Sequence, residues 1–333
     1  METSGCESGD EAGDEPGGRP GTHRWQDWSL EALLAAKAAT GHRVSVVVPS
    51  RDEAATVGDV VARVRRDLVD AVPLVDELVV IDSDSSDDTS EVAAAAGATV
   101  HRVRDIRPEL GWRPGKGEAM WKSQFVTTGS LVVFMDADLV EWDTHFVTGL
   151  LGPLLTDPGV GLVKGFYERP LSGGGDVAPA AAYDGGRVTE LVARPLIALH
   201  FPELAGLVQP LAGEWSVRRS VLAELAVPCG YAVEFAALVD TVRTHGASSI
   251  AQVDLGRRAH RHQSLRDLGA MATQILALAH ARAGCQALRH PAGQVSLRQF
   301  PAVAGEPVPA TREVDLAVRP PAWSVQEASA CER

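Results

Sequence analysis

The sequence predicts an α/β fold built around a mostly parallel sheet. Short apolar runs rich in β-branched residues alternate with helical stretches through the first half of the chain. Polar residues follow several of these runs directly, as they do where parallel strands end at a ligand site. With 333 residues, 45% of them hydrophobic, the chain can bury a large core in one or two domains.

The first expected elements are two strands and the helix between them. Residues 44–48 form a β-branched run that ends at Pro49, which favours a strand. The stretch 54–68 has apolar residues at helical spacing and predicts a helix. A second apolar run over 77–81 predicts a strand, and the acidic segment 82–88 predicts a polar turn after it.

The alternation then continues as far as a pair of acids. A helix is expected over 89–96, closing at Gly97, where the chain can adopt a positive φ. A short strand over 99–103 and a helix near 117–127 follow, and the apolar run 130–135 predicts a further strand. The first half of the chain therefore predicts a nucleotide-binding unit whose ligand lies at the carboxyl ends of the strands.

Charge and cysteine content exclude several classes of function. A formal net charge of -13 argues against a nucleic-acid partner, which would require a basic face. Part of this negative charge lies in the Gly-rich first 20 residues, which hold six acids against one base, so we expect a disordered acidic tail over 1–22. The four cysteines include no Cys-x-x-Cys pair, which predicts neither a zinc site nor a disulfide framework and fits a reducing compartment.

Nothing in the sequence predicts a membrane span. There is no basic-then-apolar leader, and no uninterrupted apolar run approaches about 18 residues. The most apolar helical stretch, 186–200, contains Arg187, Glu190 and Arg194. We therefore expect a cytoplasmic protein, with a further helix over 264–282.

Two carboxylates one residue apart follow the strand over 130–135. Asp136-Ala137-Asp138 can hold a divalent cation, and the cation can hold a diphosphate. By itself so short a motif more often marks a polar turn that ends a strand. The chain has no Gly-x-Gly-x-x-Gly after its first strand and no Gly-x-x-x-x-Gly-Lys-Ser/Thr, so dinucleotide and phosphate-loop sites lose their main support.

Other segments carry a resemblance to a known family. The order and spacing of 46–53, 81–89 and 136–138 resemble the three-part signature of A-type nucleotide-sugar glycosyltransferases. Four further segments are similar to blocks of the actinobacterial glucosyl-3-phosphoglycerate synthases, namely 113–119, 186–196, 230–234 and 258–261. The similarity runs from about residue 28 to about residue 300.

The resemblance implies an A-type glycosyltransferase fold: a Rossmann-like, mostly parallel sheet flanked by helices, with a helical C-terminal extension. It implies a nucleotide-sugar-binding subdomain over 23–165 and an acceptor-binding and C-terminal subdomain over 166–302. The remaining stretch, 303–333, is expected to be a C-terminal tail and has no functional account.

The activity that the resemblance implies is transfer of glucose from UDP-glucose to the 2-hydroxyl of D-3-phosphoglycerate, with retention at the anomeric carbon. A divalent metal would be required, with Mg²⁺ the abundant choice and Mn²⁺ or Co²⁺ possible substitutes. A homodimer is also implied, with 264–282 a plausible contact.

The resemblance also assigns residues to the donor and the metal. Asp138 and His260 would bind the metal, and Asp136 would orient ribose or sugar hydroxyls. Ala137 stands where the family commonly has serine, so one hydroxyl contact to the nucleotide would be absent. The donor-binding positions would be Pro49, Ser50, Arg51, Asp52, Glu53, Ser83, Lys116, Asp136, Ala137, Tyr231, Glu234, Arg258 and Arg261.

The acceptor carries a carboxylate and a phosphate, so its site needs cations and backbone donors. Gly186-Arg187-Val188-Thr189 would supply them at a helix N-terminus, with a forked contact from Arg187. His262 stands where the family usually has asparagine, which puts one acceptor contact in doubt. Glu234 is the candidate carboxylate near the reacting centre, where it would position more than attack, because retaining enzymes of this fold often lack a protein nucleophile.

Several alternatives stay open on the sequence alone. Lys116 could be a flexible exposed lysine, His260 a surface histidine, and Arg187 a solvated residue of a helix on which Glu190 and Arg194 pair. The same fold could serve a mannosyl-3-phosphoglycerate synthase or a polyprenyl-phosphate sugar transferase. A nucleotidyltransferase, or a non-catalytic nucleotide-sugar binder, is the alternative from another class.

Overall fold

The computed structural model describes most of the chain. The described residues are 20–168, 186–258, 264–284, 293–299, 302–303, 306–307 and 310–331. The expected acidic tail lies almost wholly outside them, and so do three of the predicted site residues, His260, Arg261 and His262.

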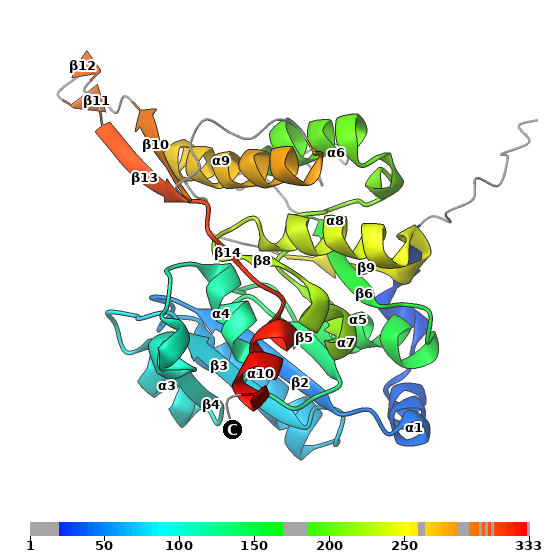
Figure 1. Cartoon of the computed structure of the whole chain (residues 1–333). Coiled ribbons are helices and arrows are strands. Elements are labelled where there is room, and N and C mark those ends of the chain that lie inside the picture. The colour runs from blue at the N-terminus through cyan, green and yellow to red at the C-terminus, as the bar shows by residue number, and fades with distance from the viewer. Residues whose placement is uncertain are drawn as a thin grey trace, which may run out of the picture.

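Within the described residues, eight strands form one central sheet in the order β1-β9-β6-β7-β5-β2-β3-β4 (Figure 1). Strand β7 is antiparallel to both neighbours, and the other pairs are parallel. The strands are β1 (Gly21–Arg24), β2 (Val44–Ser50), β3 (Glu77–Asp82), β4 (Thr99–Arg102), β5 (Leu131–Phe134), β6 (Leu162–Glu168), β7 (Trp215–Arg218) and β9 (Ile250–Arg257). The predicted α/β fold with a mostly parallel sheet is confirmed, and the sheet runs across both expected subdomains.

Alternating side chains of the strands build a core on each face of the sheet. In β2, Val46 and Val48 pack into one apolar cluster and Val47 into the other, because successive residues of a strand point to opposite faces. One cluster is covered by α1 (Leu30–Thr40), α2 (Val57–Val64), α3 (Thr89–Ala95) and α5 (His145–Thr156). The other is covered by α4 (Lys116–Ser123), α7 (Arg219–Glu224) and α8 (Val233–His245).

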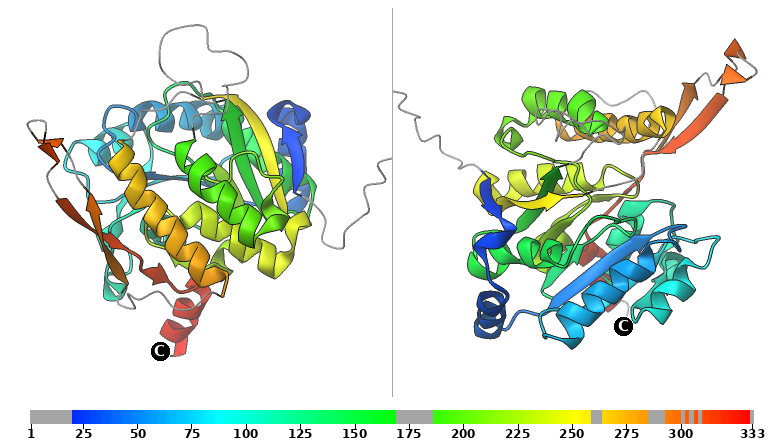
Figure 2. Two further views of the ribbon diagram at one scale, coloured as in Figure 1. Left: turned by 90° about the horizontal axis from the view of Figure 1, so that it is seen from above. Right: turned by 180° about the vertical axis from the view of Figure 1, so that it is seen from behind.

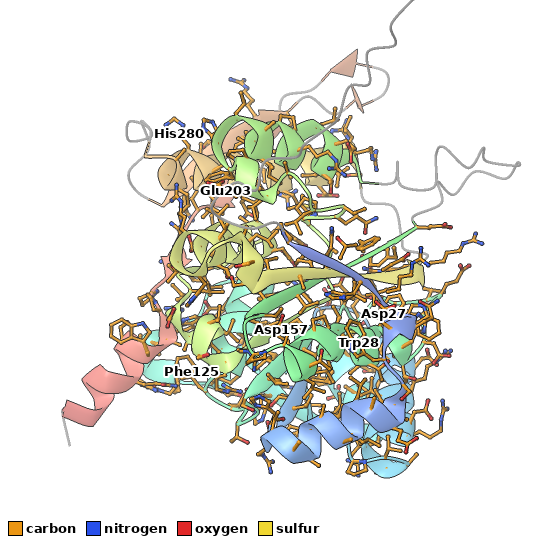
Figure 3. The ribbon with its side chains drawn as sticks, turned by 90° about the vertical axis from the view of Figure 1, so that its right-hand side faces the viewer. Asp27, Trp28, Phe125, Asp157, Glu203 and His280 are labelled. Atoms are coloured by element: carbon orange, nitrogen blue, oxygen red, sulfur yellow. The ribbon has the colours of Figure 1, made fainter. Side chains whose placement is uncertain are left out.

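A second layer of helices lies over α8. It consists of α6 (Arg194–His200) and α9 (Leu265–Arg282), which run side by side in Figures 1 and 2. Figure 3 labels Glu203, just after α6, and His280 of α9 in this layer. Beyond α9 a hairpin of β10 (Gln294–Gln299) and β13 (Ala310–Asp315) projects from the body, with the short strands β11 (Ala302–Val303) and β12 (Glu306–Pro307) at its tip.

Several element boundaries differ from the sequence prediction. The helix expected over 54–68 begins at Val57, because the Glu53 carbonyl first accepts two turn hydrogen bonds, and it continues as a π-helix to Asp70. Strand β2 runs past Pro49, since the Ser83 amide donates to the Ser50 carbonyl (2.8 Å).

Two predicted helices also change. The one expected over 117–127 ends at Ser123, whose hydroxyl donates to the Met120 carbonyl and competes with helix continuation. The one expected over 186–200 contains a π-helical segment, Thr189–Ala193, before α6.

The C-terminal segment folds back onto the body of the molecule. After β13 the chain forms β14 (Val318–Arg319), which pairs antiparallel with β8 (Val227–Pro228), and then α10 (Ala322–Cys331). In Figure 1 this segment descends from the hairpin across the front of the sheet, so residues 310–331 are ordered elements and not a loose extension. Among the helices of the described part, none is long and apolar enough to cross a membrane.

Candidate active site

The predicted motifs 46–53 and 81–89 contact each other where β2 and β3 end. The Asp52 amide donates to Ser85 Oγ (2.9 Å), and Asp52 Oδ1 accepts from the Ser86 amide (2.7 Å). The Glu53 amide donates to Thr89 Oγ1 (2.8 Å). These reciprocal bonds hold Asp52 in a left-handed conformation (φ 56°) and join the two loops into one unit. Pro49, Ser50, Arg51 and Ser83 lie along the same edge of the sheet.

The two acids after β5 bind a single guanidinium. Arg258 Nη2 donates to Asp136 Oδ2 (3.1 Å) and to Asp138 Oδ1 (2.9 Å). Burial alone would raise the pKa of Asp136, but the charges of Lys116 and Arg258 outweigh it and hold that pKa below its usual value. Asp136 is therefore an anion at any physiological pH. Ala137, between the two acids, is buried in the apolar cluster on the opposite side.

The other half of the Arg258 guanidinium faces the protein interior. Its Nη1 donates to Glu214 Oε1 (2.7 Å) and to the Tyr167 hydroxyl (2.7 Å), and that hydroxyl donates to Glu214 Oε2 (2.8 Å). Burial would lower the pKa of Arg258, but the Glu214 carboxylate and the other anions raise it well above normal. Burial raises the pKa of Glu214, and the Arg258 charge opposes that shift. The guanidinium is thus fixed on both sides and permanently charged.

Lys116 lies between two carboxylates. Its Nζ is 2.6 Å from Asp136 Oδ1 and 2.8 Å from Glu234 Oε1. Burial would lower the pKa of Lys116, but Asp136 and Glu234 raise it above its ordinary value, so the ammonium keeps its proton. The alternative of a flexible exposed lysine is wrong. Helix α4 begins at Lys116 and α8 begins one residue before Glu234, so two helix N-termini meet at the end of β5.

The loop before β7 supplies part of the site, although no sequence motif predicted it. A Cβ added at Gly213 would lie 2.1 Å from Asp136 Oδ2, so only glycine lets this loop approach the carboxylate. Lys164 of β6 is buried and donates from Nζ to the Ala212 carbonyl (2.5 Å), which holds the loop from beneath. Burial lowers the pKa of Lys164 to about 8. Because β7 is antiparallel, the residues before it arrive at the edge where β5 ends.

Lys164 and Glu214 could have been recognised in the sequence, because each is a charged residue among apolar neighbours. Lys164 interrupts the apolar strand 162–167, and Glu214 directly precedes a strand whose residues Trp215 and Val217 are apolar. A charge in such a position needs a buried partner. The sequence does not say which partner, since Arg258 is 44 residues from Glu214 and 91 from Tyr167.

A divalent cation fits the chemistry of Asp138. Its carboxylate is a hard oxygen ligand, and its side chain keeps 30% of its surface exposed although Arg258 holds one oxygen. Among the described residues, no three His, Cys, Asp or Glu side chains converge as a metal site. Asp138 would therefore need ligands from elsewhere, and the predicted partner His260 lies outside the described residues.

The predicted acceptor segment begins the helix that leads into α6. Val188 and Thr189 are buried and Arg187 is exposed. The Glu190 amide donates to the Gly186 carbonyl (2.9 Å), which is the first hydrogen bond of that helix. The ion pair that the alternative predicted is present, with Arg194 Nε 2.7 Å from Glu190 Oε1. That pair leaves the role proposed for Arg187 untouched.

Tyr231 does not pack beside Glu234 as a buried residue, because its side chain is exposed. Its amide donates to Gln274 Oε1 (2.8 Å), so α9 holds the Gly230–Tyr231 turn. At the start of α3, Asp87 Oδ1 accepts from the Thr89 amide (3.1 Å), whereas the Asp88 side chain makes no capping bond.

Comparison with known proteins places the chain in a family. Residues 45–182 match the family described as Glycosyl transferase family 2. The glucosyl-3-phosphoglycerate synthase of Mycolicibacterium paratuberculosis is 46% identical over 302 residues, which cover 90% of this chain and 89% of the relative. That of Mycobacterium tuberculosis is 47% identical over 273 residues, 82% of this chain and 81% of the relative. The chain belongs to the glucosyl-3-phosphoglycerate synthase family.

Solved structures agree with the family assignment. The M. tuberculosis glucosyl-3-phosphoglycerate synthase in complex with Mg²⁺ and UDP has a TM-score of 0.80 and 42% identity, covering 92% of this chain and 99% of that one. The complex of the same enzyme with Mn²⁺, UDP-glucose and phosphoglyceric acid has a TM-score of 0.79 at 42% identity, covering 92% and 100%. Membership of the glucosyl-3-phosphoglycerate synthase family confirms the predicted A-type glycosyltransferase fold.

Proposed function

We propose that this chain is a metal-dependent glucosyltransferase that moves glucose from UDP-glucose to the 2-hydroxyl of D-3-phosphoglycerate, with retention at the anomeric carbon. The single observation that carries the proposal is the likeness to a synthase whose structure holds Mn²⁺, UDP-glucose and phosphoglyceric acid. The charged residues at the ends of β2, β3 and β5 supply the chemistry that these substrates need.

The donor diphosphate needs positive charge, which Lys116 and Arg258 provide. Both are held at Asp136 by hydrogen bonds of 2.6 and 3.1 Å, so neither has to be ordered when the donor binds. Asp138 and His260 would hold the divalent cation, which stabilises the negative charge of the leaving diphosphate. The joined loops after β2 and β3 offer Ser50, Asp52 and Ser83 to the uridine.

Glu234 lies next to the donor charges and serves to position the sugar. It is 5% exposed, and its pair with Lys116 fixes its carboxylate 2.8 Å from the ammonium. A carboxylate held by a lysine is a poor nucleophile, which favours attack by the acceptor hydroxyl on the face that the diphosphate leaves. The hydroxyl proton then passes to an oxygen of the departing diphosphate, and Glu234 orients the glucose hydroxyls.

The acceptor would bind at the segment 186–189 beside the second helical layer. Arg187 would bind the carboxylate or phosphate of 3-phosphoglycerate as a fork, and Thr189 would donate its hydroxyl. His262 would complete this side of the site, and Arg261 would bind on the donor side.

We also propose a homodimer formed through the layer of α6 and α9. This layer and the π-helical segment before α6 present exposed leucines, namely Leu191, Leu199, Leu265 and Leu276. Light scattering on the purified protein should give twice the mass of one chain, and a Leu265→Glu/Leu276→Glu variant should give the mass of one.

The proposed site of action is the cytoplasm.

One assay tests the proposed activity. The purified protein is given UDP-glucose or GDP-mannose, with and without 3-phosphoglycerate and with and without EDTA, and nucleotide release is followed. We expect release from UDP-glucose only when both 3-phosphoglycerate and the metal are present. Release from GDP-mannose instead would identify a mannosyl-3-phosphoglycerate synthase, and no release with any phosphoglycerate would refute the proposal.

A further inference from the structure

The segment Asp315–Pro321, here named the C-terminal strap, lies directly behind the donor site. It contains β14, which pairs with β8 so that Val318 faces Pro228 and Arg319 faces Val227. The Cys229 amide then donates to the Ala317 carbonyl (3.1 Å). The strap thus extends the segment 227–230 by backbone hydrogen bonds.

Arg319 of the strap binds the first turn of α4. Its Nε donates to Glu118 Oε2 (2.8 Å) and its Nη2 to Glu118 Oε1 (2.7 Å), which is a forked ion pair. Glu118 is completely buried, and Arg319 is mostly so. Arg319 Nη1 also donates to the Leu110 carbonyl (2.9 Å), in the loop that leads to α4.

The ring of Trp121 completes this contact. The Arg319 guanidinium carbon lies 4.9 Å from the ring centre, and Trp121 Nε1 donates to the Pro320 carbonyl (2.9 Å). Phe125, labelled in Figure 3, packs edge-on against the same ring at 4.9 Å. Two successive strap residues, Arg319 and Pro320, therefore contact α4 directly.

The first turn of α4 also makes backbone contacts with the segment 228–230. The Glu118 amide donates to the Cys229 carbonyl (2.9 Å) and the Gly117 amide to the Gly230 carbonyl (3.3 Å). A Cβ added at Gly117 would lie 1.8 Å from the Pro228 carbonyl oxygen, so the two backbones are in direct contact. The first turn of α4 is held between the segment 228–230 and the strap.

We propose that Arg319 is a positioning residue of the donor site. It fixes Glu118 and the first turn of α4, so that Lys116 at the start of that helix reaches both Asp136 and Glu234. Without Arg319, the buried Glu118 carboxylate would lose its forked ion pair and keep the longer hydrogen bond from the Arg113 amide (3.3 Å). The first turn of α4 would then be held on the side of segment 228–230 and no longer by the strap. This inference rests on the proposed function only in taking the donor to be a uridine diphosphate sugar.

The test measures the binding of UDP in the presence of Mn²⁺ by calorimetry, so that it does not depend on turnover. Arg319→Met should raise the Kd for UDP by about tenfold. Arg319→Lys, which keeps the charge but not the forked contact, should recover part of the lost affinity. Arg312→Met is the matched control, because Arg312 forms an exposed ion pair with Asp267 (2.8 Å) away from α4, and it should leave the Kd unchanged. In a Lys116→Met background, Arg319→Met should change the Kd by less than about twofold, because its effect passes through Lys116.

Two outcomes would overturn the proposal. One is an unchanged Kd in Arg319→Met. The other is a loss of UDP affinity on Arg319→Met that is as large in the Lys116→Met background as in the parent, because the effect would then not pass through Lys116. If Arg319→Met does not fold, Glu118→Gln/Arg319→Met removes the unpaired buried charge and takes its place in the same measurements. A parent protein that binds UDP but transfers no glucose would count against the proposed function and leave this test valid.

Discussion

Glu214 binds the guanidinium of Arg258 from the side opposite the two aspartates, at 2.7 Å and without any exposed surface of its own. Glu214 therefore orients Arg258 and cannot itself reach a substrate. The arrangement separates two consequences of losing Arg258, one for stability and one for activity.

Arg258→Met should lower the free energy of unfolding by about 3 kcal/mol, because it leaves the buried Glu214 carboxylate without its ion-pair partner and with the Tyr167 hydroxyl as its remaining hydrogen-bond donor. The double variant Glu214→Gln/Arg258→Met should recover most of that stability and none of the activity. Chemical denaturation and a glucosyl-transfer assay on both variants make the comparison. Recovery of activity in the double variant would show that Arg258 acts only on the fold.

Gly213→Ala should reduce kcat/KM for the donor by about tenfold or more, because the new Cβ displaces the Asp136 carboxylate. Gly206→Ala is the matched control, since a Cβ at Gly206 meets no atom within 4 Å. Both variants should keep the melting temperature within a few degrees of the parent. Equal activity of the Gly213→Ala and Gly206→Ala variants would mean that the loop around residue 213 moves to make room and does not hold Asp136 in place.

Lys164 should make stability rise with pH in the alkaline range. Its pKa is about 8 in the folded protein against 10.5 unfolded, so the unfolded chain binds more protons between these values and loses them as the pH rises. The free energy of unfolding of the parent, minus that of Lys164→Met, should increase by about 2 kcal/mol from pH 8 to pH 10. Denaturant titrations across that range measure this difference. A difference that does not change with pH would mean that Lys164 does not titrate near pH 8 in the folded protein.

Asp138→Asn should keep the size of the side chain and lose the charge that a divalent cation needs. We expect turnover to fall by about 100-fold or more at moderate Mn²⁺, and part of it to return as Mn²⁺ is raised. EDTA should abolish turnover of the parent, and added Mg²⁺ or Mn²⁺ should restore it. A variant with the parent's Mn²⁺ dependence would remove Asp138 from the metal site.

Arg187→Ala should raise the KM for 3-phosphoglycerate by about tenfold and leave the KM for UDP-glucose unchanged. The control is Arg243→Ala, which removes an equal charge from the exposed last turn of α8. Initial rates at varied acceptor and donor concentrations separate the two constants. An unchanged acceptor KM would exclude Arg187 from acceptor binding.

The local signals in the sequence were enough for four strands of the sheet, β2, β3, β4 and β5, and for part of the site. Strands β2, β3 and β5 are apolar runs that end in polar residues, and this pattern placed Asp136 at a strand end. It could not place the partners of these residues, because long-range ion pairs leave no periodic pattern. Glu118 and Arg319 are 201 residues apart, and either alone reads as an ordinary surface charge.

The helix boundaries failed for a different reason. Hydrophobic spacing over 54–68 is helical throughout, but the first turn is used to meet the loop after β3, where the Ala54 amide donates to Asp87 Oδ2 (3.1 Å). The tertiary hydrogen bond thus ties residue 54 to the neighbouring loop, and the helix begins only at Val57. Single-sequence patterns do not contain that competition.

The hydrogen bonds between the loops after β2 and β3 bear on how base preference could be changed. Each loop satisfies backbone amides of the other, through Asp52 and Ser86 in one direction and through Ser85 and Thr89 in the other. Replacing one loop with that of a transferase that uses a different nucleotide would leave backbone amides of the other loop without hydrogen-bond acceptors. The two loops are a single module for exchange, and altered donor specificity should be reached by transplanting them together.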